Sequence, residues 1–275
     1  MNHPQPSERI VVGIDGSTAA INAAKWAAAE AVSRNVPLRL VQAVPERCAD
    51  EGMDDGSLEV QYAESALRDA DAALQATGEP VKVECGIVRG TPEGALIAES
   101  HDAALVCIGS VGIGRIASKV LGSTADAVAR NAHCPVAIVR TDHQPAPSAD
   151  DGPGWVAVVV DESPGNDAVL EHGFREAHLR SAPILAMGVW RWGLGEIPYG
   201  QLEDRLGPWV TRYPQVHVMP AAARRGAAEF LAHTQESVQL AVVGDEDADK
   251  VARMVGPSGP RMTGRTGCSV LVVRR

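Results

Sequence analysis

The chain has 275 residues, which is long for one α/β domain and sufficient for two domains of about 140 residues each. Hydrophobic residues make up 45% of the sequence and aromatic residues only 4%, which favours aliphatic parallel sheets under alanine-rich helices over an aromatic-rich β-sandwich. The formal net charge of -10 argues against a nucleic acid or an anionic membrane as partner, although backbone amides of an acidic protein can still bind one nucleotide.

The cysteines and the N-terminal segment indicate the cellular compartment. The five cysteines are odd in number, widely spread and form no C-x-x-C pair, so neither a disulfide framework nor a metal site is expected. The start of the chain, MNHPQPSERI, lacks the hydrophobic segment of a signal peptide, and no apolar run approaches the roughly 20 residues of a membrane span. These features predict a cytoplasmic protein.

Short apolar strands alternate with helical patterns along the first half of the chain. Thr91 and Pro92 mark one helix start, because threonine can cap a helix and proline fits the first helical position. This alternation predicts a parallel, doubly wound sheet. The expected strands cover 9–14, 38–44, 81–88, 104–108 and 136–140, and the expected helices cover 18–34, 58–77, a segment from 91 onwards and 123–131.

The pattern restarts after residues 142–154, whose proline, glycine and acidic residues are typical of a linker. A second strand over Trp155–Val160 leads into Asp161, as the first strand leads into Asp15, and the two aspartates differ by 146 positions (161 − 15). The corresponding glycines, 109 and 244, differ by 135, so the second copy lacks eleven residues, mostly around its second helix. The sequence therefore predicts two tandem α/β domains, 1–141 and 155–275.

A glycine-rich loop follows the apolar run 104–108, with the spacing G-x2-G-x9-G-[ST]. Ligands of open α/β sheets bind beyond the carboxyl ends of the strands, which is where this loop lies. Glycines let the backbone approach an anion closely, and consecutive amides followed by a helix N-terminus favour phosphate. Arg115 adds a strong cation. The loop therefore predicts triphosphate binding.

This loop, together with an early Val-Gly-Ile-Asp-Gly-Ser and a later Cys-Pro-Val-Ala-Ile-Val, resembles the universal stress protein family. The resemblance covers nearly the whole chain, twice. It implies a five-stranded parallel sheet in the order 3-2-1-4-5 in each domain, and ATP as ligand, with Mg²⁺ held by its phosphates. It also implies an intramolecular pseudo-dimer in which strands 136–139 and 270–273 meet, and it is compatible with a homodimer.

The resemblance assigns roles by position. Gly13, Ile14 and Asp15 would lie against the adenosine, with Asp15 accepting from ribose hydroxyls or orienting the adenine pocket, and Ala43 or Val44 would face the adenine ring. A simpler alternative for Asp15 is that it caps the first helix. The predicted phosphate-binding residues are Gly109, Ser110, Val111, Gly112, Ile113, Gly114, Arg115, Gly122, Ser123 and Thr124.

The matching loop of the second copy, 244–258, departs from this pattern. Asp247 stands at its second glycine, and Pro257 removes an amide donor where Ser123 stands in the first copy. Further acids crowd the turn, namely Asp245, Glu246 and Asp249. Carboxylates directed at a triphosphate repel it unless a metal intervenes, so this domain is expected to be structural or to bind a protein partner.

These features predict an ATP-binding stress-response or regulatory protein with at most weak ATP hydrolysis. The alternatives are a slow ATPase or adenylating enzyme of a related fold, and a ligand-free scaffold. Hydrolysis needs a positioned base as well as cations at the γ-phosphate, and the loop supplies no evident base. The Walker pattern is absent, and G-x-G-x-x-A over 112–117 is a weak dinucleotide fingerprint after the wrong strand.

Overall fold

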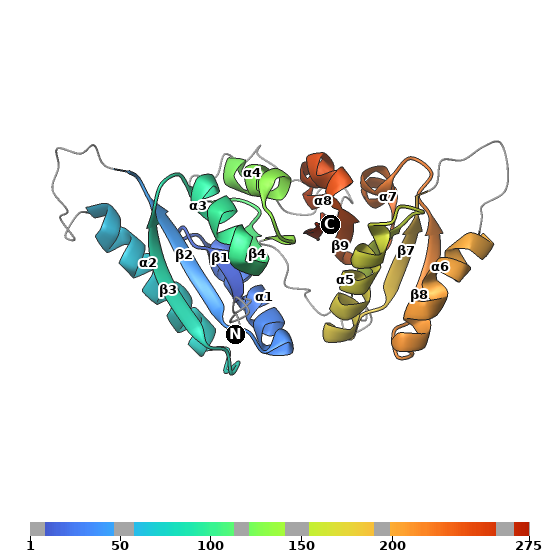
Figure 1. Ribbon diagram of the computed structural model, residues 1–275, viewed down its shortest axis with the longest axis horizontal. Helices are drawn as coiled ribbons and strands as arrows, with labels where there is room; N and C mark the ends of the chain where they lie inside the picture. Colours follow the sequence, from blue (N-terminus) through green and yellow to red (C-terminus); the bar gives the residue numbers. More distant parts are fainter. Residues whose placement is uncertain are drawn as a thin grey trace, which may run out of the picture. The chain divides into compact units, whose positions relative to one another are not determined.

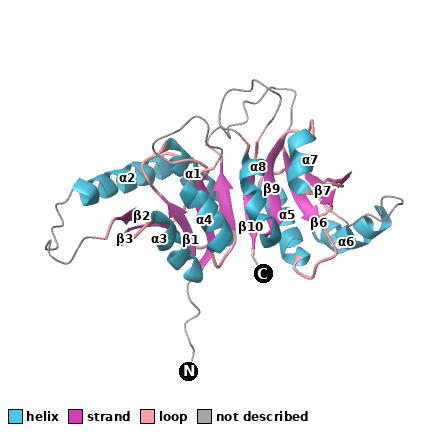
Figure 2. Ribbon diagram, turned by 90° about the horizontal axis from the view of Figure 1, so that it is seen from above, coloured by secondary structure: helices cyan, strands magenta, loops and turns pink. Residues whose placement is uncertain are grey.

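The computed structural model describes residues 9–46, 58–112, 121–140, 154–189, 199–256 and 267–274. The chain divides into two compact units, Met1–Thr141 and Asp142–Arg275 (Figure 1). In the described residues of each unit, five parallel strands lie between two layers of helices (Figure 2).

The first unit has the predicted strand order 3-2-1-4-5, since its strands follow one another as β3-β2-β1-β4-β5. The pairings within the unit are parallel, as a doubly wound sheet requires. The predicted boundaries differ from the observed ones by at most two residues. The strands are β1 (Arg9–Gly13), β2 (Leu38–Val44), β3 (Val83–Arg89), β4 (Ala103–Gly109) and β5 (Val136–Val139).

The helices of this unit begin where the sequence supplies caps. The Ser17 hydroxyl accepts from the Ala20 amide at 3.1 Å, and the Thr91 hydroxyl accepts from the Gly94 amide at 3.2 Å. One face of α1 consists of buried alanines, which let the helix approach the sheet closely. The helices are α1 (Thr18–Arg34), α2 (Leu58–Gln75), α3 (Pro92–Glu99) and α4 (Ser123–Asn131), with a short 3-10 helix η1 (Ser100–Asp102) after α3.

The second unit repeats this order as β8-β7-β6-β9-β10. Its second helix has 14 residues where the first unit has 18, so the shortening that the sequence predicted falls in part on this helix. The elements are β6 (Trp155–Val160), α5 (Asn166–Leu179), β7 (Ile184–Gly188), α6 (Tyr199–Arg212), β8 (Val218–Ala222), α7 (Ala227–His233), β9 (Val238–Gly244), the 3-10 helix η2 (Asp245–Lys250), α8 (Val251–Val255) and β10 (Ser269–Val273).

The repeat extends to one buried ion pair in each unit. Glu30 of α1, with none of its side chain exposed, pairs with Arg34 at 2.9 Å. Glu176 of α5, equally buried, pairs with Arg180 at the same helical spacing. The two glutamates are 146 positions apart (176 − 30), which is also the separation of the two aspartates that follow the first strand of each unit. The two units therefore share this buried ion pair as well as their topology.

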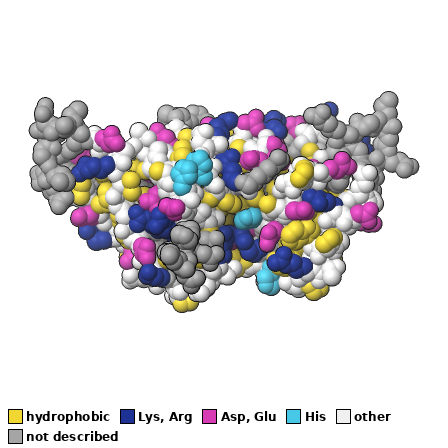
Figure 3. Space-filling model, in the orientation of Figure 1, with side chains coloured by type: hydrophobic (Ala, Val, Ile, Leu, Met, Phe, Trp, Pro, Cys, Tyr) yellow, Lys and Arg dark blue, Asp and Glu magenta, His cyan; other side chains and the backbone are white. Residues whose placement is uncertain are grey.

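The surface and core agree with the aliphatic, mixed-charge composition. Fully buried side chains are mostly valine, leucine, isoleucine and alanine. On the face displayed in Figure 3, acidic and basic side chains are interspersed among uncharged ones. Within the part of the chain that the structure describes, no helix combines the length and the hydrophobicity needed to cross a bilayer.

An ion-pair network ties the first unit together at the start of its central strands. Glu99, at the end of α3, accepts from Arg39 through both of its carboxylate oxygens at 3.0 Å, and from Arg9 at 3.2 Å. Its side chain is only 12% exposed. A partly buried carboxylate with two guanidinium partners contributes more to stability than an exposed pair does.

We expect Glu99→Gln to lower the free energy of unfolding by about 1–3 kcal/mol, because both arginines lose a charged partner in a partly desolvated position. Urea denaturation measures the change. The matched control is Glu64→Gln, since Glu64 forms an exposed pair with Arg68 at 3.5 Å, and it should change stability by less than about 0.5 kcal/mol. Equal effects of the two substitutions would show that the network contributes nothing beyond surface charge.

Candidate functional site

The turn after β1 is held by its own side chains. Asp15 Oδ1 accepts from the Ser17 amide at 2.9 Å, and the Ser17 hydroxyl in turn caps α1. Gly16 between them has a φ of +82°, a conformation that favours glycine. The N-cap of α1 is therefore Ser17 and not Asp15, although the Asp15 carboxylate supports the same turn by its bond to the Ser17 amide. The Oδ2 atom of the same carboxylate lies next to Gly112 of the glycine-rich loop.

The start of the glycine-rich loop lies directly against this carboxylate. A Cβ atom built on Gly112 would lie 2.6 Å from Asp15 Oδ2, so the position accepts no side chain without a shift. A Cβ on Gly109 would lie 2.8 Å from the main chain of Ala19, in the first turn of α1. Because the two glycines have no side chain, the main chain of the predicted phosphate loop can lie close to Asp15 and to the start of α1.

The far end of the loop returns to the same place. The Gly122 amide donates to the Ser110 carbonyl at 2.8 Å, and the Ser110 amide donates to the Val139 carbonyl at 2.9 Å. A Cβ on Gly122 would lie 3.8 Å from Val111 Cα and 3.9 Å from the Gly112 amide nitrogen. The amides of Ser110 and Gly122 thus hold the loop closed, and they are engaged within the protein.

The N-terminus of α4 lies next to this closure. Gly122 is its N-cap, and no side chain caps the helix there. The amides of Ser123 and Thr124 begin the helix and, as first-turn amides, have no partner within it. The Ser110 hydroxyl is also buried without a hydrogen-bond partner in the described structure. Three predicted residues, Ile113, Gly114 and Arg115, lie outside the described residues.

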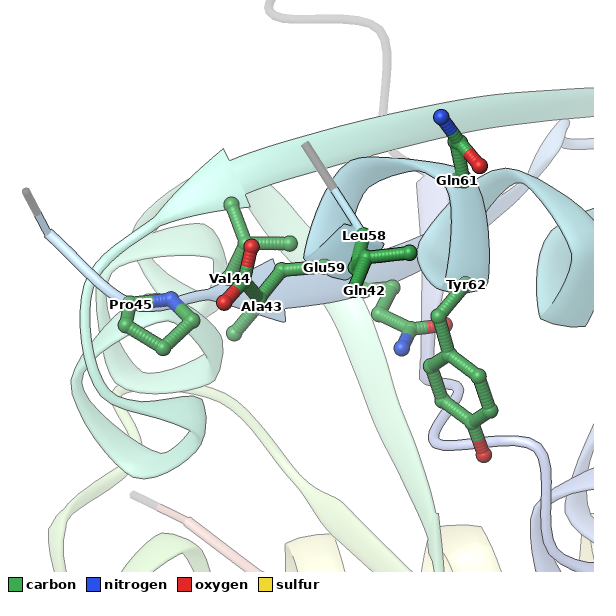
Figure 4. Close-up of a pocket in the computed structure, with 8 residues that line it drawn as sticks. All are labelled: Gln42, Ala43, Val44, Pro45, Leu58, Glu59, Gln61 and Tyr62. Atoms are coloured by element: carbon green, nitrogen blue, oxygen red, sulfur yellow. The ribbon is translucent and has the colours of Figure 1, made fainter. Parts of the chain in front are cut away.

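A pocket of about 680 Å³ opens beside the turn, between the end of β2 and the start of α2 (Figure 4). It contains Ala43 and Val44, the residues predicted to face adenine. The Tyr62 hydroxyl donates to the Asp15 carbonyl at 3.1 Å, which joins the pocket to the turn after β1. The lining residues are Gln42, Ala43, Val44, Pro45, Leu58, Glu59, Gln61 and Tyr62.

The sequence did not single out Gln42, Leu58 or Tyr62. In a parallel sheet, the ends of strands and the starts of the following helices meet at one edge, where ligands bind. The position of Leu58 at the start of a predicted helix could therefore have indicated that it lines the pocket. For Gly13 and Ile14 the structure shows packing contacts, and their contact with adenosine stays a prediction. A Cβ on Gly13 would lie 2.8 Å from Leu96 of α3, and Ile14 is 4% exposed. Both residues position the turn by packing.

The second unit keeps the turn but changes the loop. Asp161 Oδ1 accepts from the Ser163 amide at 2.7 Å, as Asp15 does from Ser17. After β9, however, the chain enters η2, and a Cβ on Gly244 would lie 2.6 Å from Glu246 Cδ. Carboxylates therefore gather at the edge where the first unit presents glycine backbone. The buried Asp247 pairs with Lys250 at 2.7 Å.

Burial and the crowding of carboxylates raise the pKa of Glu246. Partial desolvation raises the pKa of its carboxyl above the ordinary 4.5, and a hydrogen bond with Asp245 and the negative charges of Asp161 and Asp245 raise it further. A raised pKa in the folded state means that the ionised form destabilises the fold. That cost is absent below the ordinary pKa and appears as the pH rises through the folded value.

We expect Glu246→Gln to raise the melting midpoint at pH 8 by about 1 °C, since the side chain is partly exposed and the effect is screened. The difference from the unmodified protein should vanish as the pH falls below the ordinary value of 4.5. Differential scanning fluorimetry across pH measures it, with the exposed Glu203 of α6, changed to Gln, as control. A gain that is the same at every pH would contradict electrostatic crowding.

A smaller pocket of about 270 Å³ lies in the second unit and is lined by Arg225, Gly226, Ala228, Glu229, Lys250 and Arg253. No group of three or more His, Cys, Asp or Glu side chains able to hold a metal ion is found among the described residues. The described cysteines are free thiols, three of them buried and Cys85 exposed. The turn after β1, the glycine loop and the pocket at β2 therefore form the candidate site, all at the carboxyl edge of one sheet.

Comparisons with known proteins bear on the family and the fold. A model of the universal stress protein family matches residues 6–140. A universal stress protein of Mycobacterium tuberculosis strain H37Rv is 48% identical over 267 residues, covering 97% of this chain and 96% of the relative. A second one from that strain is 37% identical over 277 residues, covering 99% and 98%. The crystal structure of a universal stress protein from Archaeoglobus fulgidus superposes with a TM-score of 0.68 at 17% identity, covering 98% of this chain and 97% of that one.

Proposed function

Because this chain belongs to the universal stress protein family, we propose that its first unit binds ATP, with Mg²⁺ on the phosphates, as a regulatory ligand. The observation that carries the proposal is the meeting of Asp15 with Gly112, beside the uncapped N-terminus of α4. One crevice thus combines an acceptor for hydroxyls with donors for an anion. The family association links such a ligand to survival of stress.

The adenosine end of the ligand fits the side of the crevice nearer β2. Asp15 Oδ2 supplies an acceptor for ribose hydroxyls. Ala43, Val44 and the Tyr62 ring offer an apolar wall for adenine in the adjoining pocket. The Tyr62 hydroxyl bond to the Asp15 carbonyl fixes the distance between the two subsites. Apolar walls with a few placed polar groups are typical of nucleotide pockets.

The phosphate end fits the start of α4. First-turn amides and the helix dipole favour negative charge, and the hydroxyls of Ser123 and Thr124 add donors there. The Asp15 carboxylate lies beside Gly112 and the start of α4, so it disfavours phosphate in direct contact with itself. The proposed ligand therefore has its ribose at Asp15 and its phosphates at α4, and Mg²⁺ on the phosphates would lower their repulsion by the carboxylate.

We expect Gly112→Ala to weaken ATP binding by at least about tenfold, because its Cβ would overlap Asp15 Oδ2 and turn the carboxylate away from the ribose. The control is Gly207→Ala in α6, where an added Cβ meets nothing within 4 Å. Isothermal titration with Mg-ATP gives both affinities, and circular dichroism verifies the folds. Unchanged affinity in a folded Gly112→Ala protein would contradict this site.

We further propose that the nucleotide is a ligand and not a substrate. Asp15, the acidic group of the crevice, is engaged through Oδ1 by the Ser17 amide, which leaves it poorly suited to activate water. Phosphate release with saturating ATP should therefore remain below about 1 s⁻¹, the lower range of ordinary enzymes. Faster release that Asp15→Asn abolishes would favour the ATPase alternative.

The second unit is proposed to be structural or to bind a protein partner. Its turn at Asp161 has the same geometry as the turn at Asp15, so the difference lies in the loop after β9. There the Glu246 carboxylate lies against Gly244, and Asp245 hydrogen-bonds to Glu246. A triphosphate would meet negative charge where the first unit offers amides.

A further inference from the structure

The smaller pocket, in the second unit, is basic although the chain as a whole has a net charge of -10. It lies where α7 and α8 pack against each other (Figure 1). Its charged lining consists of three cations and one carboxylate, namely Arg225, Lys250, Arg253 and Glu229. Cations gathered around a concave site attract anions locally, whatever the net charge of the whole protein.

Arg225 is the cation of this pocket that is available to a ligand. Arg253 pairs with Glu229 at 2.9 Å, and Lys250 pairs with the buried Asp247 at 2.7 Å. Arg225 is exposed, and no hydrogen bond or ion pair links it to another described residue. Because the other two cations each have a carboxylate as partner, the charge of Arg225 is in excess.

The first unit has no side chain at the positions that correspond to Arg225 and Glu229. The starts of α7 and α3 are 135 positions apart (227 − 92), as are the glycines that end β9 and β4. At the same separation, Arg225 corresponds to Gly90 and Glu229 to Gly94 (225 − 90 and 229 − 94). The repeated fold therefore does not require these charged groups, which are a property of the second unit.

We propose that this pocket binds a phosphate group, either as free phosphate or as the phosphate of a small ester, a site beyond the proposed function because that function assigns no small ligand to this unit. A guanidinium can donate two parallel N–H groups to phosphate oxygens, and an ammonium adds a compact charge. Arg225 precedes α7 and Lys250 belongs to η2, so the two cations approach a ligand from different elements. The volume of about 270 Å³ suits a ligand smaller than a nucleotide.

Nuclear magnetic resonance of the full chain tests the site locally, because Gly226 lines the pocket and its amide signal reports on binding there. Titration with inorganic phosphate, at a constant ionic strength of about 0.15 M, should shift this signal saturably. A parallel titration with glycerol 3-phosphate distinguishes the two sources of the phosphate group. Tighter binding of the ester supports a small ester as the ligand, and tighter binding of inorganic phosphate supports free phosphate.

Arg225→Gln should weaken the binding of the preferred probe by about fivefold or more, because the excess charge and its paired donors are lost. The matched control is Arg224→Gln, which makes the same change of charge at a neighbouring exposed residue that does not line the pocket. It should weaken binding by less than about twofold at this ionic strength. Both residues are exposed, so both variants should keep the fold, and unchanged signals elsewhere verify this.

Two results would overturn the proposal. One is the absence of a saturable shift of the Gly226 signal with either probe in the unmodified protein. The negative charges of Glu246 and Asp249, which act on Lys250, would then cancel the attraction. The other is equal weakening by Arg225→Gln and Arg224→Gln, which would show general surface attraction instead of a site. Neither result would bear on ATP binding by the first unit.

Discussion

The candidate site depends on the close contact between the Asp15 carboxylate and the main chain of Gly112. This contact is possible because Gly112 has no side chain, and a Cβ atom there would overlap Asp15 Oδ2. The closure of the loop depends on the same condition, since Gly122 lies against Val111 and Gly112 and donates to Ser110. Together these contacts place the uncapped start of α4 beside Asp15. An acceptor for hydroxyls and a set of donors for an anion thus share one edge of the sheet.

The two units show how the same fold can present different charges at the same edge of its sheet. Both have the strand order that a doubly wound sheet requires, and both hold an aspartate in the turn after the first strand. The second unit then places carboxylates at the end of β9, where Glu246 lies against Gly244 and its pKa is raised. In the proposed function, therefore, the charge and bulk of a few loop residues, and not the topology, decide which unit binds the nucleotide.

Much of the fold could be predicted from the sequence because its signals are local. The apolar run of β2 and the helices α1 and α4 begin and end where the pattern predicted, and Thr91 and Pro92 marked the start of α3. The roles of individual site residues depend on tertiary contacts, which the sequence does not display. Gly13 makes room for Leu96, and Tyr62 reaches the Asp15 carbonyl from another helix. For the same reason the sequence does not show that Gln42, a polar residue in an apolar strand, is buried.

The central claim is that the crevice at Asp15 binds a triphosphate and its counterpart at Asp161 does not. The stoichiometry of Mg-ATP binding, measured by calorimetric titration of the full chain at known protein concentration, tests it most directly. One nucleotide per chain is the predicted result. Two per chain would show that the carboxylates after β9 do not exclude phosphate, and none would show that the meeting of Asp15, Gly112 and α4 serves packing alone.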